Sequence, residues 1–299
     1  MSVVVVGAAV MDLKGRSRAP LVRATSNPAT VVMTPGGVGR NIAENLARLG
    51  TPVCLVAAVG PDAAADRLLA DTAAAGVDTS HVMTTPEPTG TYIAVLDPAG
   101  ELDIALSDLA ATQALTPARL EPSRAAIEAA RMLVVDGNLP APVVGWLLDV
   151  AAAAGVPVVV EPVSVAKAAR LRESLRPGRP VAVLTPNADE LAALGPTPGD
   201  LTGRGVRSVW VRRGAHGSDW YATGRPGVRV AAHGSPVVDV TGAGDAMTAG
   251  WVHAHLGGAR DTEAVAYGQA VAELTVSSSH TVRPDLTDAL VRARLEETA

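Results

Sequence analysis

A carboxylate placed directly after a run of small residues is the clearest sign of chemistry in this sequence. Gly242, Ala243 and Gly244 open a helical pattern, and Asp245 follows at once. Backbone N–H groups at a helix N-terminus lack partners in the helix, and small side chains let a phosphate approach them. Asp245 would repel that phosphate unless it takes the proton of an attacking hydroxyl, which is general-base catalysis of phosphoryl transfer. The alternative is an acid that stabilises a helix N-terminus beside a glycine turn.

A second glycine-rich segment runs over residues 36–41 and precedes another helical pattern. It is not the dinucleotide-binding fingerprint, because Ile42 stands where the last glycine is required. A Gly-Gly pair before a helix lets a sugar hydroxyl approach the backbone at Gly37, and Asn41 could donate a hydrogen bond to it. A glycine turn beside a solvated asparagine explains the same residues without a ligand.

The composition excludes several classes of protein. The two lysines, Lys14 and Lys167, do not follow a glycine, so there is no P-loop. A single cysteine, Cys54, rules out an intramolecular disulfide and a cysteine-cluster metal site. A net charge of −5 argues against nucleic-acid or anionic-membrane partners. No long apolar run and no basic leader occur, so we expect a cytoplasmic protein without a signal peptide or membrane span.

Short apolar runs alternate with Ala- and Leu-rich amphipathic stretches, and these elements must position the two segments. Continuous apolar runs are typical of strands buried on both faces of a parallel sheet. We predict such strands over residues 3–7, 53–59, 132–136, 156–161, 181–185 and 208–212. We predict helices over residues 39–49, 63–75, 141–154, 189–194, 243–256, 262–277 and 284–295. This alternation predicts a doubly wound α/β fold with helices flanking a mostly parallel sheet.

Two segments, 16–34 and 84–109, interrupt the alternation and are rich in Pro, Thr and Ser. They contain strand-like pieces at residues 21–24, 30–33 and 89–96. We therefore expect one domain over residues 1–299, with a small β-sheet that forms a lid over one end of the main sheet. Strands at the edge of the lid would present unpaired backbone N–H and C=O groups, which tend to be covered in proteins. We therefore expect a homodimer that associates through the lid.

Both glycine-rich segments match the signatures of a known family. The positions that fit the first signature are Gly36, Gly37, Gly39, Asn41, Ala43, Gly50 and Gly60. Residues 239–250, with Asp245 among them, fit the second. The chain is thus similar, over nearly its whole length, to the ribokinase-like (PfkB) sugar and nucleoside kinases. The resemblance implies a ribokinase-like fold, a small-molecule acceptor under the lid, ATP on the C-terminal side of the chain, and Mg²⁺.

The resemblance also implies roles for polar residues near the phosphates. Asp245 looks like the catalytic base, and residues 242–244 look like the anion hole. Asn187 and Glu190 resemble the family's Asn-x-x-Glu segment, which helps to place Mg²⁺ and phosphate. An N-cap followed by an ordinary first-turn acid explains that pair as well. Glu161, at the end of a predicted strand, is expected to face the phosphate and metal region, because ligands gather at strand ends in open α/β sheets.

Further residues are assigned to nucleotide or cation binding by the resemblance. Gly214 and Gly217 look like the family's nucleotide loop. Arg212 stands where many members have Thr, so a guanidinium could contact phosphate there instead. His280 either flanks adenine or is an exposed loop side chain.

Residues 239–241 and 277–282 fall where many members hold a monovalent cation such as K⁺. Asp239 and Thr241 are the residues that the resemblance assigns to it.

The acceptor is indicated by a third group of residues. Asp12 matches the aspartate with which the family grips vicinal sugar hydroxyls, although Val10 replaces an Asn found in other members. Asn27 has a donor and an acceptor for the edge of a uracil-like ring, or it forms a turn. Asn138, after a strand, is expected to reach the sugar or the base.

Segments 25–28, 36–50, 136–139, 161–169 and 281–286 are similar to the pseudouridine kinases of the family. This similarity implies phosphorylation of the 5′-hydroxyl of pseudouridine. The alternatives are a kinase for uridine, adenosine, ribose or fructose on the same fold, and a non-catalytic sugar or nucleoside sensor. The intact set of Asp245, residues 242–244 and Glu190 argues against the sensor.

Overall fold

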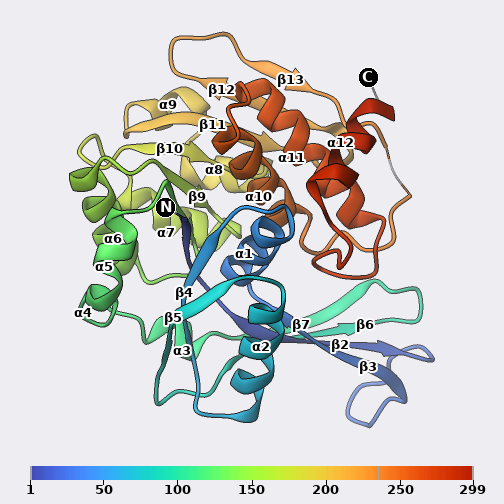
Figure 1. The fold of residues 1–299 in the computed structure, drawn as a ribbon. Helices are drawn as coiled ribbons and strands as arrows, with labels where there is room; N and C mark the ends of the chain where they lie inside the picture. Colours follow the sequence, from blue (N-terminus) through green and yellow to red (C-terminus); the bar gives the residue numbers. More distant parts are fainter. Residues whose placement is uncertain (1, 235, 298–299) are drawn as a thin grey trace.

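The computed structural model describes residues 2–234 and 236–297. In these ranges, nine strands form one sheet in the order β13-β12-β11-β10-β9-β8-β1-β4-β5 (Figure 1). Neighbouring strands from β11 to β5 run parallel, and β12 and β13 add an antiparallel edge. The predicted doubly wound, mostly parallel sheet is therefore confirmed.

The strands of this sheet are β1 (Val3–Val6), β4 (Val53–Val59), β5 (Asp78–Thr84), β8 (Met132–Asp136), β9 (Val158–Glu161), β10 (Val181–Leu184), β11 (Val206–Arg212), β12 (Ser218–Ala222) and β13 (Val228–Val230). Every residue of β1, β4, β8 and β9 is buried, as the continuous valine-rich runs predict. Strands β5, β12 and β13 were not predicted, because polar residues interrupt their apolar pattern.

The longer helices are α1 (Val38–Arg48), α2 (Ala63–Ala74), α6 (Ala141–Ala154), α7 (Val165–Ser174), α8 (Ala188–Leu194), α10 (Ala243–Leu256), α11 (Asp261–Val276) and α12 (Asp288–Glu297). Shorter helical pieces are α3 (Ala110–Gln113), α4 (Pro117–Leu120), α5 (Arg124–Glu128) and α9 (Pro198–Thr202). Helix α7 was not predicted, and α12 begins at Asp288 rather than at residue 284, after Pro284.

Alternate residues of each strand face two separate cores. Val3 and Val5 of β1 pack with α1, α2, α10 and α11, whereas Val4 and Val6 pack with α3, α6, α7 and α8. This follows from the two-residue period of a strand, which sends successive side chains to opposite faces. Helices therefore cover both faces of the sheet, and the ends of its central strands are left to line a site.

Four further strands form a smaller sheet that protrudes from the main body, at lower right in Figure 1. They are β2 (Val10–Ser17), β3 (Ala29–Gly36), β6 (Gly90–Leu96) and β7 (Leu102–Asp108), in the order β3-β2-β6-β7. We call this sheet the lid. The predicted strand at residues 21–24 is wrong, because this stretch belongs to an irregular loop between β2 and β3.

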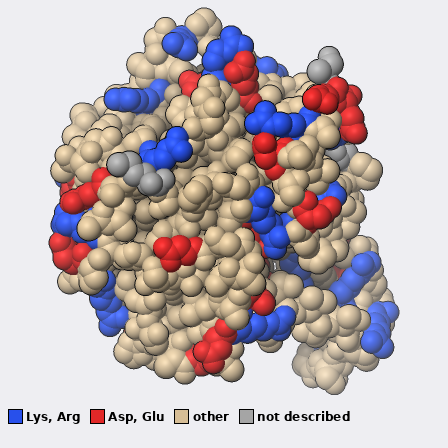
Figure 2. Space-filling model, viewed as in Figure 1, with Lys and Arg blue, Asp and Glu red and all other residues tan. Residues whose placement is uncertain are grey.

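The distribution of charged side chains can be followed on the surface of the molecule. On the face shown in Figure 2, basic and acidic side chains are interspersed rather than gathered into one basic patch. Among the residues that the structure describes, no helix is long and apolar enough to cross a membrane.

Candidate active site

The first glycine-rich segment lets helix α1 begin against the end of β1. A Cβ atom on Gly39 would lie 2.7 Å from Gly7 Cα, and one on Gly37 would lie 2.5 Å from the Ala8 carbonyl oxygen. Gly37 is also the N-cap of α1, with φ of 95°, a conformation that favours glycine. This close packing brings Asn41, in the first turn of α1, to the end of the sheet.

The second glycine-rich segment lets helix α10 begin in close contact with the backbone of another part of the chain. Gly242 is its N-cap, with φ of 80°, and a Cβ atom there would lie 2.2 Å from the Thr281 carbonyl oxygen. Asp245 lies in the first turn of α10 and is buried. The segment thus forms the helix N-terminus that the sequence predicts, with the carboxylate inside it.

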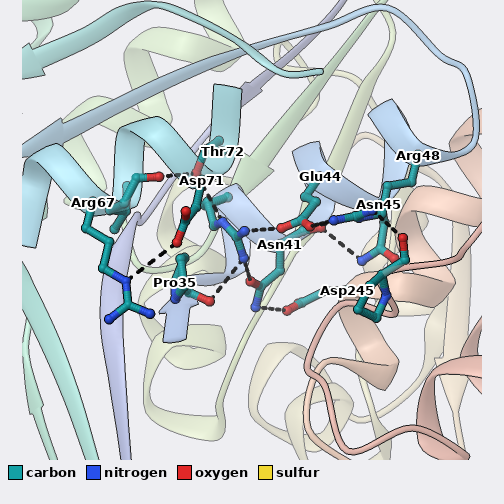
Figure 3. A network of polar contacts seen from close by, with 12 residues as sticks. Pro35, Asn41, Glu44, Asn45, Arg48, Arg67, Asp71, Thr72 and Asp245 are labelled. Atoms are coloured by element: carbon teal, nitrogen blue, oxygen red, sulfur yellow. Dashed lines mark hydrogen bonds and ion pairs between the residues drawn. The ribbon is translucent and has the colours of Figure 1, made fainter. Parts of the chain in front are cut away.

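These two helix starts meet at one contact. Asn41 Nδ2 donates a hydrogen bond to Asp245 Oδ2, with 2.9 Å between the atoms (Figure 3). Burial raises the pKa of Asp245 well above its ordinary value. The hydrogen bond from Asn41 and the charge of Arg212 act in the opposite direction, and the charges of Glu161 and Asp136 raise the pKa further. A carboxyl with a raised pKa is suited to accept a proton near neutral pH.

A cavity of about 1070 Å³ lies between the lid and the main sheet and contains Asp245. The predicted site residues that line it are Asp12, Gly37, Asn41, Asn138, Asp239, Thr241, Gly242, Gly244 and Asp245. The fold therefore gathers the residues predicted for the acceptor and those predicted for phosphoryl transfer around one space.

Asp12 enters the cavity from the lid strand β2. Its partner in β3 is Thr34, and its carboxylate leans toward Gly36, where a Cβ atom would lie only 2.2 Å from Asp12 Oδ2, so glycine makes room for the carboxylate. Burial raises the pKa of Asp12 to about 6, although Lys14 and Arg40 oppose this effect. A carboxylate held in this position can accept hydrogen bonds from two neighbouring hydroxyls.

A buried ion pair lies against the start of α10. Arg212 Nη2 donates to Glu161 Oε1 and to the Thr185 carbonyl oxygen. A Cβ atom on Gly244 would lie 2.3 Å from Arg212 Nη1, so the guanidinium is close to the N-terminus of α10. The other oxygen of Glu161, Oε2, accepts hydrogen bonds from the hydroxyls of Thr185 (2.8 Å) and Thr248 (3.1 Å).

Asn187 and Glu190 form a capping box at the start of α8. Asn187 Oδ1 accepts from the Glu190 N–H, and Glu190 Oε2 accepts from the Asn187 N–H, each at 2.9 Å. Burial raises the pKa of Glu190. Asn187 and Glu190 therefore cap the N-terminus of α8, which was the structural alternative for this pair. Glu190 Oε1 takes no part in the capping box.

The two candidate magnesium residues differ in how well they fit that ion. Glu161 is already held by a guanidinium and two hydroxyls, so it fits a structural partner of Arg212 better than a metal ligand. Glu190 fits, because its Oε1 is a hard oxygen donor, the kind that Mg²⁺ prefers. Within residues 2–234 and 236–297, no cluster of three or more His, Cys, Asp or Glu side chains could hold a metal.

Several predicted site residues are not among those that line the main cavity, namely Asn27, Glu161, Asn187, Glu190, Arg212, Gly214, Gly217, Ala243 and His280. Asn27 is used within its own loop: its Oδ1 accepts from the Val22 N–H at 2.8 Å, and its Nδ2 donates to the Val22 carbonyl oxygen at 2.9 Å. It therefore forms a turn here and does not line the cavity. His280 is exposed and contacts Ser278 of its own loop.

The predicted nucleotide loop, Gly214 and Gly217, forms the turn between β11 and β12. A Cβ atom on Gly217 would lie 2.1 Å from the Val230 carbonyl oxygen, so this turn requires glycine. Arg212 ends β11 directly before it.

Asp136 is a buried acid close enough to Asp245 for its charge to raise the pKa of that carboxyl, and the sequence assigned it no role. It is fully buried at the end of β8, and its Oδ2 accepts from the Ala8 N–H at 2.8 Å and from the Gly39 N–H at 3.1 Å. Its Oδ1 accepts from Asn138 Nδ2 at 2.8 Å. Burial raises its pKa to about 6, against the effect of these donors. An acid at the end of a buried strand was the available signal.

Both lysines line the cavity, although the sequence assigned neither of them a role. Lys14 Nζ lies 2.7 Å from Asp239 Oδ2 and donates to Thr241 Oγ1 at 3.2 Å, which joins the lid to the segment before α10. Burial would raise the pKa of Asp239, but hydrogen bonds from Lys14 and Thr241 hold it below its ordinary value. Burial lowers the pKa of Lys167.

Comparisons with known proteins agree with this arrangement. Residues 1–288 match the model of the pfkB family carbohydrate kinases. The chain belongs to the PfkB family. It is 34% identical over 308 residues to a pseudouridine kinase of Escherichia coli (strain K12), and the match covers 98% of this chain and 96% of that protein.

Solved structures of two kinases share the fold. A carbohydrate kinase from Agrobacterium tumefaciens is 33% identical, with a TM-score of 0.87, and the match covers 99% of this chain and 97% of that one. A ribokinase of Arabidopsis thaliana, solved with ribose and ATP, is 25% identical, with a TM-score of 0.86 and coverage of 99% and 98%. The ribokinase-like fold is confirmed, and the protein is a phosphotransferase with an alcohol acceptor, a kinase of sugars or nucleosides.

Proposed function

We propose that this PfkB kinase transfers the γ-phosphoryl group of ATP to the 5′-hydroxyl of pseudouridine, giving pseudouridine 5′-phosphate and ADP. The observation that carries the kinase mechanism is the buried Asp245 at the start of α10, facing a cavity that Asp12 enters from the lid. The similarity to the pseudouridine kinase of Escherichia coli supports the choice of acceptor.

In the proposed reaction, the 5′-oxygen of the acceptor attacks the γ-phosphorus of ATP, and Asp245 accepts the proton of that hydroxyl. A new O–P bond forms, and the bond from that phosphorus to the β-phosphate oxygen breaks. The N–H groups of residues 242–244 stabilise the charge on the transferring group. Mg²⁺, held near Glu190, would neutralise phosphate charge when bound. The lid excludes water and so limits hydrolysis of ATP.

The acceptor is held from both sides of the cavity. Asp12 accepts hydrogen bonds from the ribose hydroxyls, and Gly37 and Asn41 contact the sugar from α1. Asn138 reaches the sugar or the base. Asn27 would have to exchange its loop hydrogen bonds to reach the base, whereas Tyr92 of β6 already lines the cavity.

ATP is proposed to lie on the C-terminal side of the chain. Its contacts would come from Asn187, Arg212, Gly214, Gly217, Thr241 and His280. A monovalent cation such as K⁺ would bind near Asp239, whose carboxylate attracts the Lys14 ammonium in this structure. Activity in potassium chloride compared with choline chloride tests the cation. An ATP-dependent reaction of this kind fits a cytoplasmic enzyme.

We also propose that the chain is one domain with a lid. Two copies of the chain would then associate through their lids. Val31, Met33, Ile104 and Leu106 are exposed apolar side chains that the strand register places on one face of the lid, opposite Asp12. A second copy of the chain would cover this apolar face. Sedimentation of the wild type and of an Ile104→Lys variant tests the assembly.

The second candidate is a kinase for another nucleoside or a sugar, and the similarity to a ribokinase solved with ribose favours ribose among these. The 5′ position is tested with 5′-deoxypseudouridine, which keeps the base and the ribose diol but lacks the acceptor oxygen. It should inhibit the reaction with pseudouridine and should yield no phosphorylated product by mass spectrometry. Phosphorylation of this analogue would show that another hydroxyl is the acceptor.

A further inference from the structure

Arg40 is a buried charged side chain next to the acceptor site that the proposed mechanism does not use. It is only 5% exposed. Its Nη1 donates to Asn41 Oδ1 at 3.2 Å and to the Pro35 carbonyl oxygen at 3.0 Å. Its Nε donates to Thr72 Oγ1 at 3.2 Å, and its Nη2 is paired with Glu44. Figure 3 shows these partners converging from α1, α2 and the end of β3.

The contact with Asn41 decides which way that amide points. The Asn41 oxygen faces a donor, Arg40 Nη1, and its nitrogen faces an acceptor, Asp245 Oδ2. A flipped amide would place its oxygen against the carboxylate and its NH₂ group against the guanidinium, so both hydrogen bonds would become repulsive contacts. Arg40 therefore selects the orientation in which Asn41 donates to Asp245.

The same guanidinium reaches the base of the lid. Pro35 lies near the end of β3, next to the part of β2 that carries Asp12, since Pro35 is paired with Met11 in the sheet. Pro35 and Asn41 share Arg40 Nη1 as their donor. A displacement of the lid strand at Pro35 would thus be transmitted to Asp245 through the side chains of Arg40 and Asn41.

We propose that Arg40 is a positioning residue, which holds the Asn41 amide so that it donates to Asp245 and which connects that amide to the lid. The inference rests on Asp245 as the base of the proposed reaction. It does not depend on which acceptor the enzyme phosphorylates.

The charges around both side chains define what a change at Arg40 should do. Arg40 is faced by Glu44, Asp12, Arg48 and Asp71. Asp245 is faced by the carboxylates of Glu161 and Asp136, which raise its pKa, and by Arg212, which lowers it together with the Asn41 hydrogen bond. If the Asn41 amide is free to flip, its contribution is lost and the pKa of Asp245 rises. The base is then protonated at a higher pH.

The test is the pH dependence of kcat in Arg40→Lys, which keeps a positive charge beside Glu44 but cannot make the same set of directed hydrogen bonds. We expect the acidic limb to move to higher pH by about 1–2 units, which is the scale of one hydrogen bond to a charged group. Activity should be recovered substantially at high pH. Arg48→Lys is the matched control, because Arg48 shares Glu44 but donates to Pro284 rather than to Asn41. Its acidic limb should stay in place.

A second measurement separates positioning from a structural effect. In an Asn41→Ala background, Arg40→Lys should cause no further shift of the acidic limb, because the amide through which it acts is gone. An equal loss of kcat at every pH, or the same shift with and without Asn41, would overturn the inference. If wild-type enzyme fails to phosphorylate pseudouridine, the proposed acceptor is wrong, and the same profiles are measured with the acceptor that is used.

Discussion

The side-chain amide of Asn41 lies 2.9 Å from the carboxylate of Asp245 and donates a hydrogen bond to it. The two residues belong to helices α1 and α10, which pack against each other although they are far apart in the sequence. Each helix begins at a glycine whose added Cβ atom would collide with the backbone of another segment. The two glycine-rich segments thus build one site, with the base from one and its hydrogen-bond donor from the other.

Asp245→Asn should lower turnover by roughly 10²–10⁴-fold, the usual scale for loss of a general base. The amide keeps the size of the side chain but cannot accept the hydroxyl proton. Nucleotide binding should change little, because the N–H groups of residues 242–244 remain. ADP release and the thermal shift caused by ATP measure the two effects, with the exposed Asp66→Asn as control. Near-normal turnover would refute the role of Asp245.

Asp12→Asn should make the protein more stable at pH 7.5 while it lowers activity. The pKa of Asp12 is about 6 in the folded protein against an ordinary value of 3.8, so the folded state binds more protons between these values and its stability falls as pH rises through them. A difference of this size corresponds to at most about 3 kcal/mol. Thermal unfolding should show a higher Tm for the variant at pH 7.5 and a vanishing difference near pH 4. A lower Tm at pH 7.5 would contradict the assignment.

Gly242→Ala should lose both activity and stability, because its φ is positive and a Cβ atom would lie 2.2 Å from the Thr281 carbonyl oxygen. Gly258→Ala is the matched control: its φ is 94°, but nothing lies within 4 Å of the added atom. The control should cost about 1–2 kcal/mol from backbone strain alone. Chemical denaturation and ADP release compare the two variants. Equal losses of stability in both would show that the contact with Thr281 is unimportant.

Arg212→Leu should be strongly destabilising, by about 3–5 kcal/mol, because it leaves Glu161 buried without its cation. The double variant Arg212→Leu/Glu161→Leu should recover part of that loss, since Glu161 is no longer an unpaired buried charge, whereas Glu190 and Asp245 still lose the Arg212 cation. Urea denaturation of the two variants and the wild type measures the difference. A double variant no more stable than Arg212→Leu would show that the ion pair is not the cause.

The sequence predicted the parts of the fold that depend on local patterns. Continuous valine runs are typical of strands in a parallel sheet, and β4 and β8 have the predicted bounds. Glycines that require close backbone approach mark the starts of α1 and α10. The strands with mixed polarity, such as β5 and β12, could not be found in this way, because their burial depends on neighbours that only the assembled sheet provides.

The sequence could predict those parts of the site in which a single residue or a single motif carries the chemistry. Asp245 and Asp12 line the cavity as expected. Pairings between distant residues were not predictable: Glu161 with Arg212, and Lys14 with Asp239, depend on how strands and lid are placed in three dimensions. Asn27 had two interpretations, and the choice between them required the geometry of its loop.

The acceptor and the reaction are decided together by ADP release from MgATP, with purified protein and pseudouridine, uridine, adenosine, ribose or fructose, each offered separately. We expect kcat/KM for pseudouridine to exceed that for each of the others by at least about tenfold, a ratio within reach of a few specific contacts. We also expect this activity to be lost in Asp245→Asn. Preference for another acceptor would contradict the proposed substrate, and absence of turnover with all five would contradict the proposed reaction.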